Sequence, residues 1–139
     1  MRRSNARLGL FLAALLALAP GSAAEPPLLV GAVVTESGNL ADLAADLRKS
    51  LLLWQEEANA AGGLLGRGVD LRLDDDRSNP AASGELYERL IRDERCDLLI
   101  GPMGSASTIG AAQAAENNRR VLVNATGAAR ATQKGNAQY

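Results

Sequence analysis

The sequence predicts an α/β fold in which a parallel sheet is covered by helices on both faces. Four short apolar segments alternate along the chain with three segments of helical periodicity. The connections are short, and most of the apolar segments are apolar throughout, which is typical of strands buried on both faces. Right-handed crossovers place the first strand inside the sheet, with the second strand on one side of it and the third on the other.

The chain opens with a predicted signal peptide, residues 1–24. A basic start with three arginines precedes an apolar run at 8–19 that is too short to span a bilayer. Small residues then lead to the cleavage that we predict after Ala24. We therefore expect a mature protein that is exported to the periplasm and does not insert into the membrane.

The first strand is predicted at Leu28–Val34, and it ends in the polar loop Thr35–Asn39. The next segment has the periodicity of a helix with one apolar stripe and a charged opposite side. The stripe consists of Leu40, Leu43, Leu47, Leu51, Trp54 and Ala58. Asn-Ala-Ala-Gly-Gly at 59–63 ends the helix, because glycine suits the left-handed C-cap. Trp54 is interpreted as core packing.

Alternating residues at Val69–Leu73 predict a second strand near the edge of the sheet. The aspartates at 74–76 follow it, and such a cluster could hold magnesium or accept a phosphoryl group. We interpret it instead as a solvated turn, because Asn79 and Pro80 then supply the N-cap and first position of a helix. That helix is predicted over Pro80–Glu94, and its inward residues are Leu86, Leu90 and Ile91.

A third strand, Cys96–Ile100, stops at Gly101-Pro102, because proline removes a ladder donor and restricts the residue before it. Hydroxyl residues then begin a predicted helix over Ser105–Asn117, which marks them as N-cap signals. The loop therefore brings together free backbone N–H groups and the positive end of a helix dipole, which attract a carboxylate or phosphate. The alternative is that these serines only cap the helix. A fourth strand is predicted at Val121–Val123.

Three polar loops are expected to meet at one edge of this sheet. They are 35–39, 101–108 and 124–128, and each follows the carboxyl end of a strand, where a crevice opens as the strand order reverses. Hydroxyls, amides and glycines fill these loops, without an acid–base pair suited to catalysis. The sequence therefore predicts a site that binds a small molecule rather than an enzyme.

The amino-acid composition excludes several classes of function. The chain contains no histidine, which excludes histidine-based catalysis and the usual zinc sites. Its formal net charge of -1 provides no basic field for nucleic acid or anionic lipid. The single cysteine, Cys96, allows no internal disulfide and is interpreted as a small buried hydrophobe. We expect neither a cofactor nor a metal.

Four motifs in this order resemble a known family. They are Thr35–Asn39 after the first strand, Asn-Ala-Ala-Gly-Gly-Leu-Leu-Gly-Arg at 59–67, Asp-Asp-Arg-Ser-Asn-Pro at 75–80 and Gly-Pro-Met-Gly-Ser at 101–105. Together they are similar to the N-terminal lobe of type I periplasmic solute-binding proteins of ABC transporters, of the leucine/isoleucine/valine-binding type. The resemblance implies two lobes that close over a branched-chain-type amino acid or related carboxylate and present it to a membrane permease.

The family pattern also implies which residues hold the ligand. Ser105, with the backbone at Gly104, and Thr126 with Ala128 correspond to the positions that bind an amino acid's carboxylate. Ala128 stands where a hydroxyl residue is usual, so this position departs from the pattern. Leu43 falls near the position that covers the ligand's apolar end.

The resemblance further implies that residues 25–139 form a truncated N-terminal lobe, without the second lobe and hinge. Alone, this segment would offer half a cleft, so we expect it to bind its ligand weakly or not at all.

Three other functions remain as alternatives. The same lobes serve as ligand-binding ectodomains of receptors, which a downstream transmembrane helix would indicate. A transcription repressor with a similar core needs an N-terminal helix-turn-helix, and a signal peptide takes its place here. A metal-dependent enzyme would use the aspartates at 74–76, and loss of metal-dependent stabilisation on Asp75→Ala would reveal it.

Overall fold

The computed structural model describes residues 25–132, so the predicted signal peptide and its cleavage site lie outside the described part of the chain. The elements follow in the order β1 Leu28–Val34, α2 Ala41–Ala60, β2 Val69–Asp75, η2 Pro80–Ala82, α3 Ser83–Arg92, β3 Leu98–Ile100, α4 Ser105–Asn117, β4 Leu122–Val123 and η3 Arg130–Thr132. The four strands form one parallel sheet in the order β2-β1-β3-β4. The predicted α/β fold and the interior place of β1 are confirmed.

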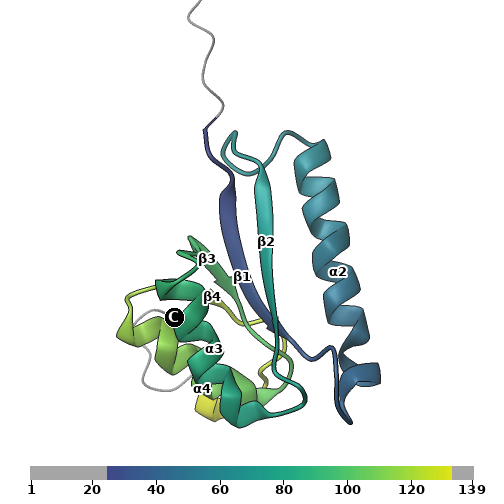
Figure 1. Cartoon of the computed structure of the whole chain (residues 1–139), viewed down its shortest axis with the longest axis vertical. Helices are drawn as coiled ribbons and strands as arrows, with labels where there is room; N and C mark the ends of the chain where they lie inside the picture. The colour runs from purple at the N-terminus through teal and green to yellow at the C-terminus, as the bar shows by residue number, and fades with distance from the viewer. Residues whose placement is uncertain (1–24, 133–139) are drawn as a thin grey trace, which may run out of the picture.

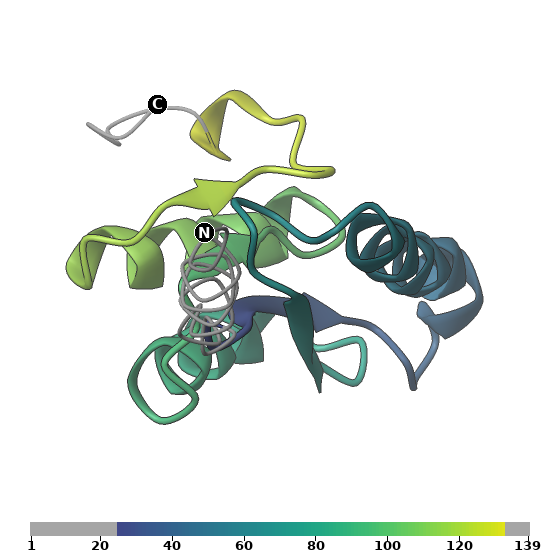
Figure 2. The same cartoon turned by 90° about the horizontal axis from the view of Figure 1, so that it is seen from above.

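Helices cover both faces of the sheet. Helix α2 lies along one face, and α3 and α4 lie together on the other (Figure 1). The view from above shows α2 well separated from the pair formed by α3 and α4 (Figure 2). Residues on opposite faces of β1 accordingly enter different cores: Val30 packs in the core that Trp54 adjoins, and Val33 lies with Leu90. The two-residue period of a strand thus divides the apolar residues of β1 between the two faces of the sheet.

The apolar stripe of α2 is shorter than the sequence predicts. Leu47, Leu51, Trp54 and Ala58 belong to or adjoin the cores on this face, which confirms Trp54 as a packing residue. Leu43 is 71% exposed, so its predicted place on the buried stripe is wrong. It lies in the first turn of α2, beside the loops at the carboxyl edge of the sheet rather than over the strands. No helix within 25–132 has the length and apolarity to cross a bilayer.

Two predicted strands begin later than expected. Strand β3 starts at Leu98, because the Cys96 N–H closes the end of α3 by donating to the Leu90 carbonyl oxygen at 3.0 Å. Cys96 is nonetheless fully buried, as predicted. Strand β4 starts at Leu122 and contains two residues. The predicted helix over Pro80–Glu94 begins as the short turn η2 and ends at Arg92.

Glycine allows the two helices on one face to touch through their backbones. A Cβ placed on Gly110 of α4 would lie 3.0 Å from the backbone nitrogen of Gly84 in α3. An interior glycine costs a helix about 1 kcal/mol relative to alanine. Gly110 lies in the interior of α4, so there this cost accompanies a close approach between α3 and α4 that the sequence did not reveal.

Candidate ligand-binding site

A groove of about 200 Å³ lies at the carboxyl edge of the sheet. The start of α2, the turn after β2 and the start of α4 form its walls. Its apolar side-chain lining comprises Leu40, Leu43, Pro80, Met103 and Ala106, and its polar side-chain lining comprises Thr35, Asp76, Ser78, Ser105 and Ser107. Two of the predicted loops, 35–39 and 101–108, meet here, together with the turn after β2, which was not among the loops predicted to form the site.

The start of α4 provides the groove with hydrogen-bond donors. The N-cap of α4 is Gly104, with φ 83°, and no side chain caps the helix. The predicted hydroxyl cap is therefore wrong: Ser105 lies inside the helix, and the Thr108 hydroxyl donates back to the Gly104 carbonyl oxygen at 2.8 Å. The first backbone N–H groups of a helix have no partner within it. Residues 104–107 line the groove, so its wall combines the N–H groups of residues 105–107 with the positive end of the helix dipole.

The Ser105 hydroxyl keeps its hydrogen available. Its oxygen accepts the Ala129 N–H at 3.1 Å, which fixes the side chain between α4 and the segment after β4. A hydroxyl that accepts one bond can still donate its own hydrogen. Ser105 can therefore donate to an acceptor in the groove while the Ala129 N–H holds it in place.

Thr126 supports the loop before α4 rather than lining the groove. Its hydroxyl oxygen accepts the Gly104 N–H at 2.8 Å and donates to the Pro102 carbonyl oxygen at 2.9 Å. Ala128 is exposed and lies next to the residue that binds Ser105. Of the predicted ligand-binding residues, the groove therefore brings together Gly104, Ser105 and Leu43, with Thr126 behind them and Ala128 outside its lining.

The interpretation of the aspartates at 74–76 as a solvated turn is wrong. Asp76 is 4% exposed, and its carboxylate accepts the Thr35 hydroxyl at 2.8 Å and the Ser78 N–H at 3.0 Å. These bonds join the end of β1 to the turn after β2 under the groove. Hydroxyl residues follow the ends of both strands, which was a sign of this contact in the sequence. The sequence did not show which of these residues pair with each other.

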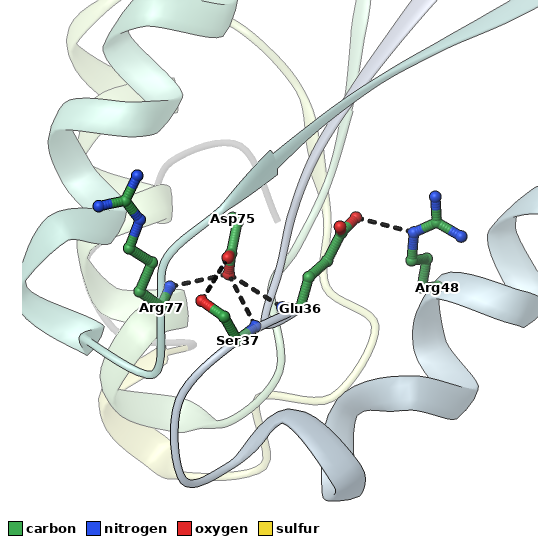
Figure 3. A network of polar contacts seen from close by, with 5 residues as sticks. All are labelled: Glu36, Ser37, Arg48, Asp75 and Arg77. Atoms are coloured by element: carbon green, nitrogen blue, oxygen red, sulfur yellow. Dashed lines mark hydrogen bonds and ion pairs between the residues drawn. The ribbon is translucent and has the colours of Figure 1, made fainter.

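Asp75 organises a second set of contacts, shown in Figure 3. Its carboxylate accepts the N–H groups of Glu36 at 2.9 Å, Ser37 at 3.3 Å and Arg77 at 2.8 Å. The Ser37 hydroxyl adds a bond of 2.6 Å, and Glu36 pairs with Arg48 at 2.7 Å. Arg77 is in the left-handed region with φ 53°, so the Asp75 carboxylate stabilises a turn that L-residues rarely adopt.

The three aspartates do not converge on one point. Asp74 pairs with Arg89, whereas Asp75 and Asp76 bind the loop after β1 and its neighbouring turn. Within residues 25–132, no group of three or more histidine, cysteine, aspartate or glutamate side chains could hold a metal ion. The arrangement of these carboxylates is that of a structural clamp between two loops.

We expect the Asp75 contacts to make stability depend on acid pH. Partial burial pushes the pKa of Asp75 upward, but hydrogen bonds from the Ser37 hydroxyl and from neighbouring backbone N–H groups outweigh it. The net pKa lies below its ordinary value of 3.8. Because the folded state holds the ionised form more strongly than the unfolded state, this stabilisation is present above the unfolded pKa and is lost as pH falls through the folded pKa.

The measurement is the urea midpoint of the wild type and of Asp75→Asn at a series of pH values. Asparagine keeps an acceptor oxygen but removes the charge. The wild type should exceed the variant in stability near neutral pH, and the difference should shrink below about pH 4. A difference that stays constant across this range would show that the charge of Asp75 contributes nothing.

The parallel sheet, the groove at its carboxyl edge and the uncapped helix start define a ligand-binding α/β domain. A family model described as periplasmic binding protein matches residues 27–139. The chain therefore belongs to the periplasmic binding protein family.

Individual relatives agree with this assignment. Leu/Ile/Val-binding protein homolog 8 of Brucella suis is 34% identical over 116 residues, which cover 84% of this chain and 28% of that protein. The chemotactic signal transduction system substrate-binding protein BasB of Halobacterium salinarum is 31% identical over 102 residues, which cover 72% of this chain and 25% of that protein.

A solved structure of the same kind matches the fold. The branched-chain amino acid transporter substrate binding protein LivJ from Streptococcus pneumoniae, in complex with isoleucine, superposes with a TM-score of 0.76 at 25% identity. The match covers 81% of this chain and 32% of that chain. The chain thus spans about a quarter to a third of the length of these relatives.

Proposed function

We propose that the chain is the N-terminal lobe, residues 25–139, of a solute-binding protein that captures a branched-chain-type amino acid or similar small carboxylate for an ABC permease. The observation that carries this proposal is the start of α4, where unpaired backbone N–H groups and the Ser105 hydroxyl face a groove without a capping side chain. A carboxylate placed there would gain charge-assisted hydrogen bonds and the favourable end of the helix dipole.

The opposite wall of the groove suits the other end of such a ligand. Leu40, Leu43 and Met103 provide apolar surface, and Leu43 is exposed in this open lobe. Burying one aliphatic side chain contributes about 1.5–3 kcal/mol. The names of the Brucella protein and the Streptococcus transporter protein, which refer to leucine, isoleucine and valine or to branched-chain amino acids, support this ligand class. The groove needs no acid–base pair, in keeping with binding rather than catalysis.

The proposal includes export of the protein to the periplasm. The predicted signal peptide, with cleavage after Ala24, and the family of periplasmic binding proteins support that location. The proposed partners are a small-molecule ligand and a membrane permease.

Sensing is the second candidate function, and a specific relative favours it. BasB is named as the substrate-binding protein of a chemotactic signal transduction system. Capture of a small solute is the first step in both functions, so the same site would serve a receptor partner in place of a permease.

Titration of the mature chain with L-isoleucine, followed by amide NMR, tests the binding site. NMR detects the weak, millimolar binding expected of a single lobe. We expect the amides of Gly104–Ser107 to shift. Ser105→Ala should weaken binding about tenfold or more, because a hydrogen bond to a charged group contributes ~1.5–3 kcal/mol. Ser50→Ala, an exposed serine of α2, is the matched control and should leave binding unchanged.

Two further ligands separate the parts of the proposal. L-isoleucinol lacks the carboxylate and should not shift these amides, whereas acetate should shift them weakly. Shifts with acetate but not with L-isoleucine would leave a carboxylate site and remove the amino-acid assignment. Shifts with neither ligand would contradict the carboxylate site at the start of α4.

A further inference from the structure

Strands β1 and β3 separate directly beneath the groove. They pair from Val30 with Leu98 to Ala32 with Ile100, and β3 then ends while β1 continues to Val34. The next donor on β1 is the Val33 N–H, and the last acceptor on β3 is the Ile100 carbonyl. Both groups lie at the last pair of this ladder, where a buried backbone group is costly to leave without a hydrogen bond. Val33 is fully buried.

The Tyr87 hydroxyl supplies both partners. Tyr87 extends from α3 and is fully buried. Its oxygen accepts the Val33 N–H at 3.2 Å and donates to the Ile100 carbonyl oxygen. Burial raises the pKa of the Tyr87 hydroxyl, so the group remains a protonated donor. The Tyr87 hydroxyl thus connects the two strands through hydrogen bonds at the point where their pairing ends.

The Ile100 carbonyl is the first point of the loop that leads to the groove. After it, the Gly101 N–H donates to the Val123 carbonyl oxygen at 2.7 Å, and the Gly104 N–H donates to the Thr126 hydroxyl at 2.8 Å. These bonds hold the loop on the side of β4. The Tyr87 hydroxyl holds it on the side of β1, so the loop is anchored between two strands.

We propose that Tyr87 is a positioning residue for the groove: its hydroxyl bridges β1 and β3 where they separate and sets the position of the loop 101–105, and with it the start of α4. The role of Tyr87 in ligand affinity rests on the function proposed above, whereas its bridging of the strands does not. Tyr87 has no place in the lining of the groove, so it acts through Gly104 and Ser105.

The hydroxyl, rather than the ring, carries this role. The ring packs in the core that contains Leu90 and Leu99, and phenylalanine would fill the same space. Tyr87→Phe therefore removes one oxygen atom, and with it the hydrogen bonds to the Val33 N–H and the Ile100 carbonyl. Ile91→Val is the matched control, because Ile91 lies on the same helix and in the same core but bonds to neither strand.

The test compares amide hydrogen exchange and L-isoleucine affinity in the wild type, Tyr87→Phe and Ile91→Val. In Tyr87→Phe we expect the amides of Val33 and Gly104 to exchange about tenfold faster than in Ile91→Val, a factor that corresponds to about 1.4 kcal/mol. The dissociation constant for L-isoleucine should rise by about the same factor relative to the control. A merely structural role would change global stability in both variants and leave these ratios near one.

The two proposals fail in different ways. If the wild type binds no L-isoleucine but Tyr87→Phe still exposes Val33 and Gly104 to exchange, the ligand assignment fails and the bridge stands. If both variants exchange and bind alike, Tyr87 only packs in the core and the positioning role is overturned. Should Tyr87→Phe not fold, the wild type still decides: a Val33 amide that exchanges faster than the ladder amides of β1 would contradict the bridge.

Discussion

Gly63→Ala is expected to lower the free energy of unfolding by about 3 kcal/mol or more, because it combines backbone strain with a steric clash. Gly63 has φ +84°, and a Cβ built on it would lie 1.9 Å from the carbonyl oxygen of Arg67. That oxygen accepts the Leu64 N–H at 2.8 Å. The backbone must therefore move and break the turn between α2 and β2.

The consequence extends beyond the turn itself. The Arg67 side chain donates to the carbonyl oxygens of Pro26 at 2.8 Å and Pro27 at 3.0 Å, which hold the segment before β1. Displacing the Arg67 backbone pulls this side chain away from both carbonyls. The substitution should therefore loosen the beginning of the central strand as well as the turn.

Gly62→Ala is the matched control for this prediction. Gly62 has a similar φ of +97°, but a Cβ built on it meets nothing within 4 Å. It should cost only the backbone strain, about 1–2 kcal/mol. Urea unfolding followed by the fluorescence of Trp54, the single tryptophan, measures both variants. Equal losses would show that the contact with Arg67 contributes nothing and that the φ value alone decides.

Asp76→Ala is the second substitution with a large expected effect, a loss of about 2–4 kcal/mol. It removes the acceptor of the Thr35 hydroxyl and the Ser78 N–H, and the carboxylate is almost completely buried. Ser78 has φ 61°, so the lost bond also releases a left-handed residue. Because Thr35, Asp76 and Ser78 all line the groove, its wall should loosen with the turn.

Asp76→Asn separates the loss of the hydrogen bonds from the loss of the charge. One carboxylate oxygen accepts both bonds, and the amide oxygen of asparagine can take its place. We expect Asp76→Asn to retain most of the stability that Asp76→Ala loses, as measured by urea unfolding. If the two variants lose the same amount, the charge rather than the pair of hydrogen bonds stabilises the turn.

The sequence predicted most accurately the elements that local residue patterns specify. The runs of apolar residues and the glycines between them predicted the four strands and the bounds of α4, and right-handed crossovers predicted the order of the first three strands. The Asn79 cap was also predictable, and its side chain accepts the Ala81 N–H as expected. These features depend on residues that are close in sequence, where periodicity and capping chemistry act directly.

Sequence reasoning failed where the partner of a side chain lies far along the chain. Asp76 looked like part of a solvated turn because its partner Thr35 is 41 residues away. Nothing in the sequence pointed to a bridging role for Tyr87, and its partner Val33 is 54 residues away. Leu43 fitted the helical period, yet the sheet does not extend far enough to cover it.

The sequence by itself determined the parallel α/β architecture and the meeting of the loops 35–39 and 101–108 at the carboxyl edge of the sheet. The family resemblance also pointed to Ser105, which lines the groove. Only the tertiary structure decided that α4 starts without a cap, that Thr126 supports the loop, and that Tyr87 bridges the separating strands. The physical reason is that apolar periodicity is a property of residues that are close in sequence. A buried hydrogen bond needs two groups that only the folded chain brings together.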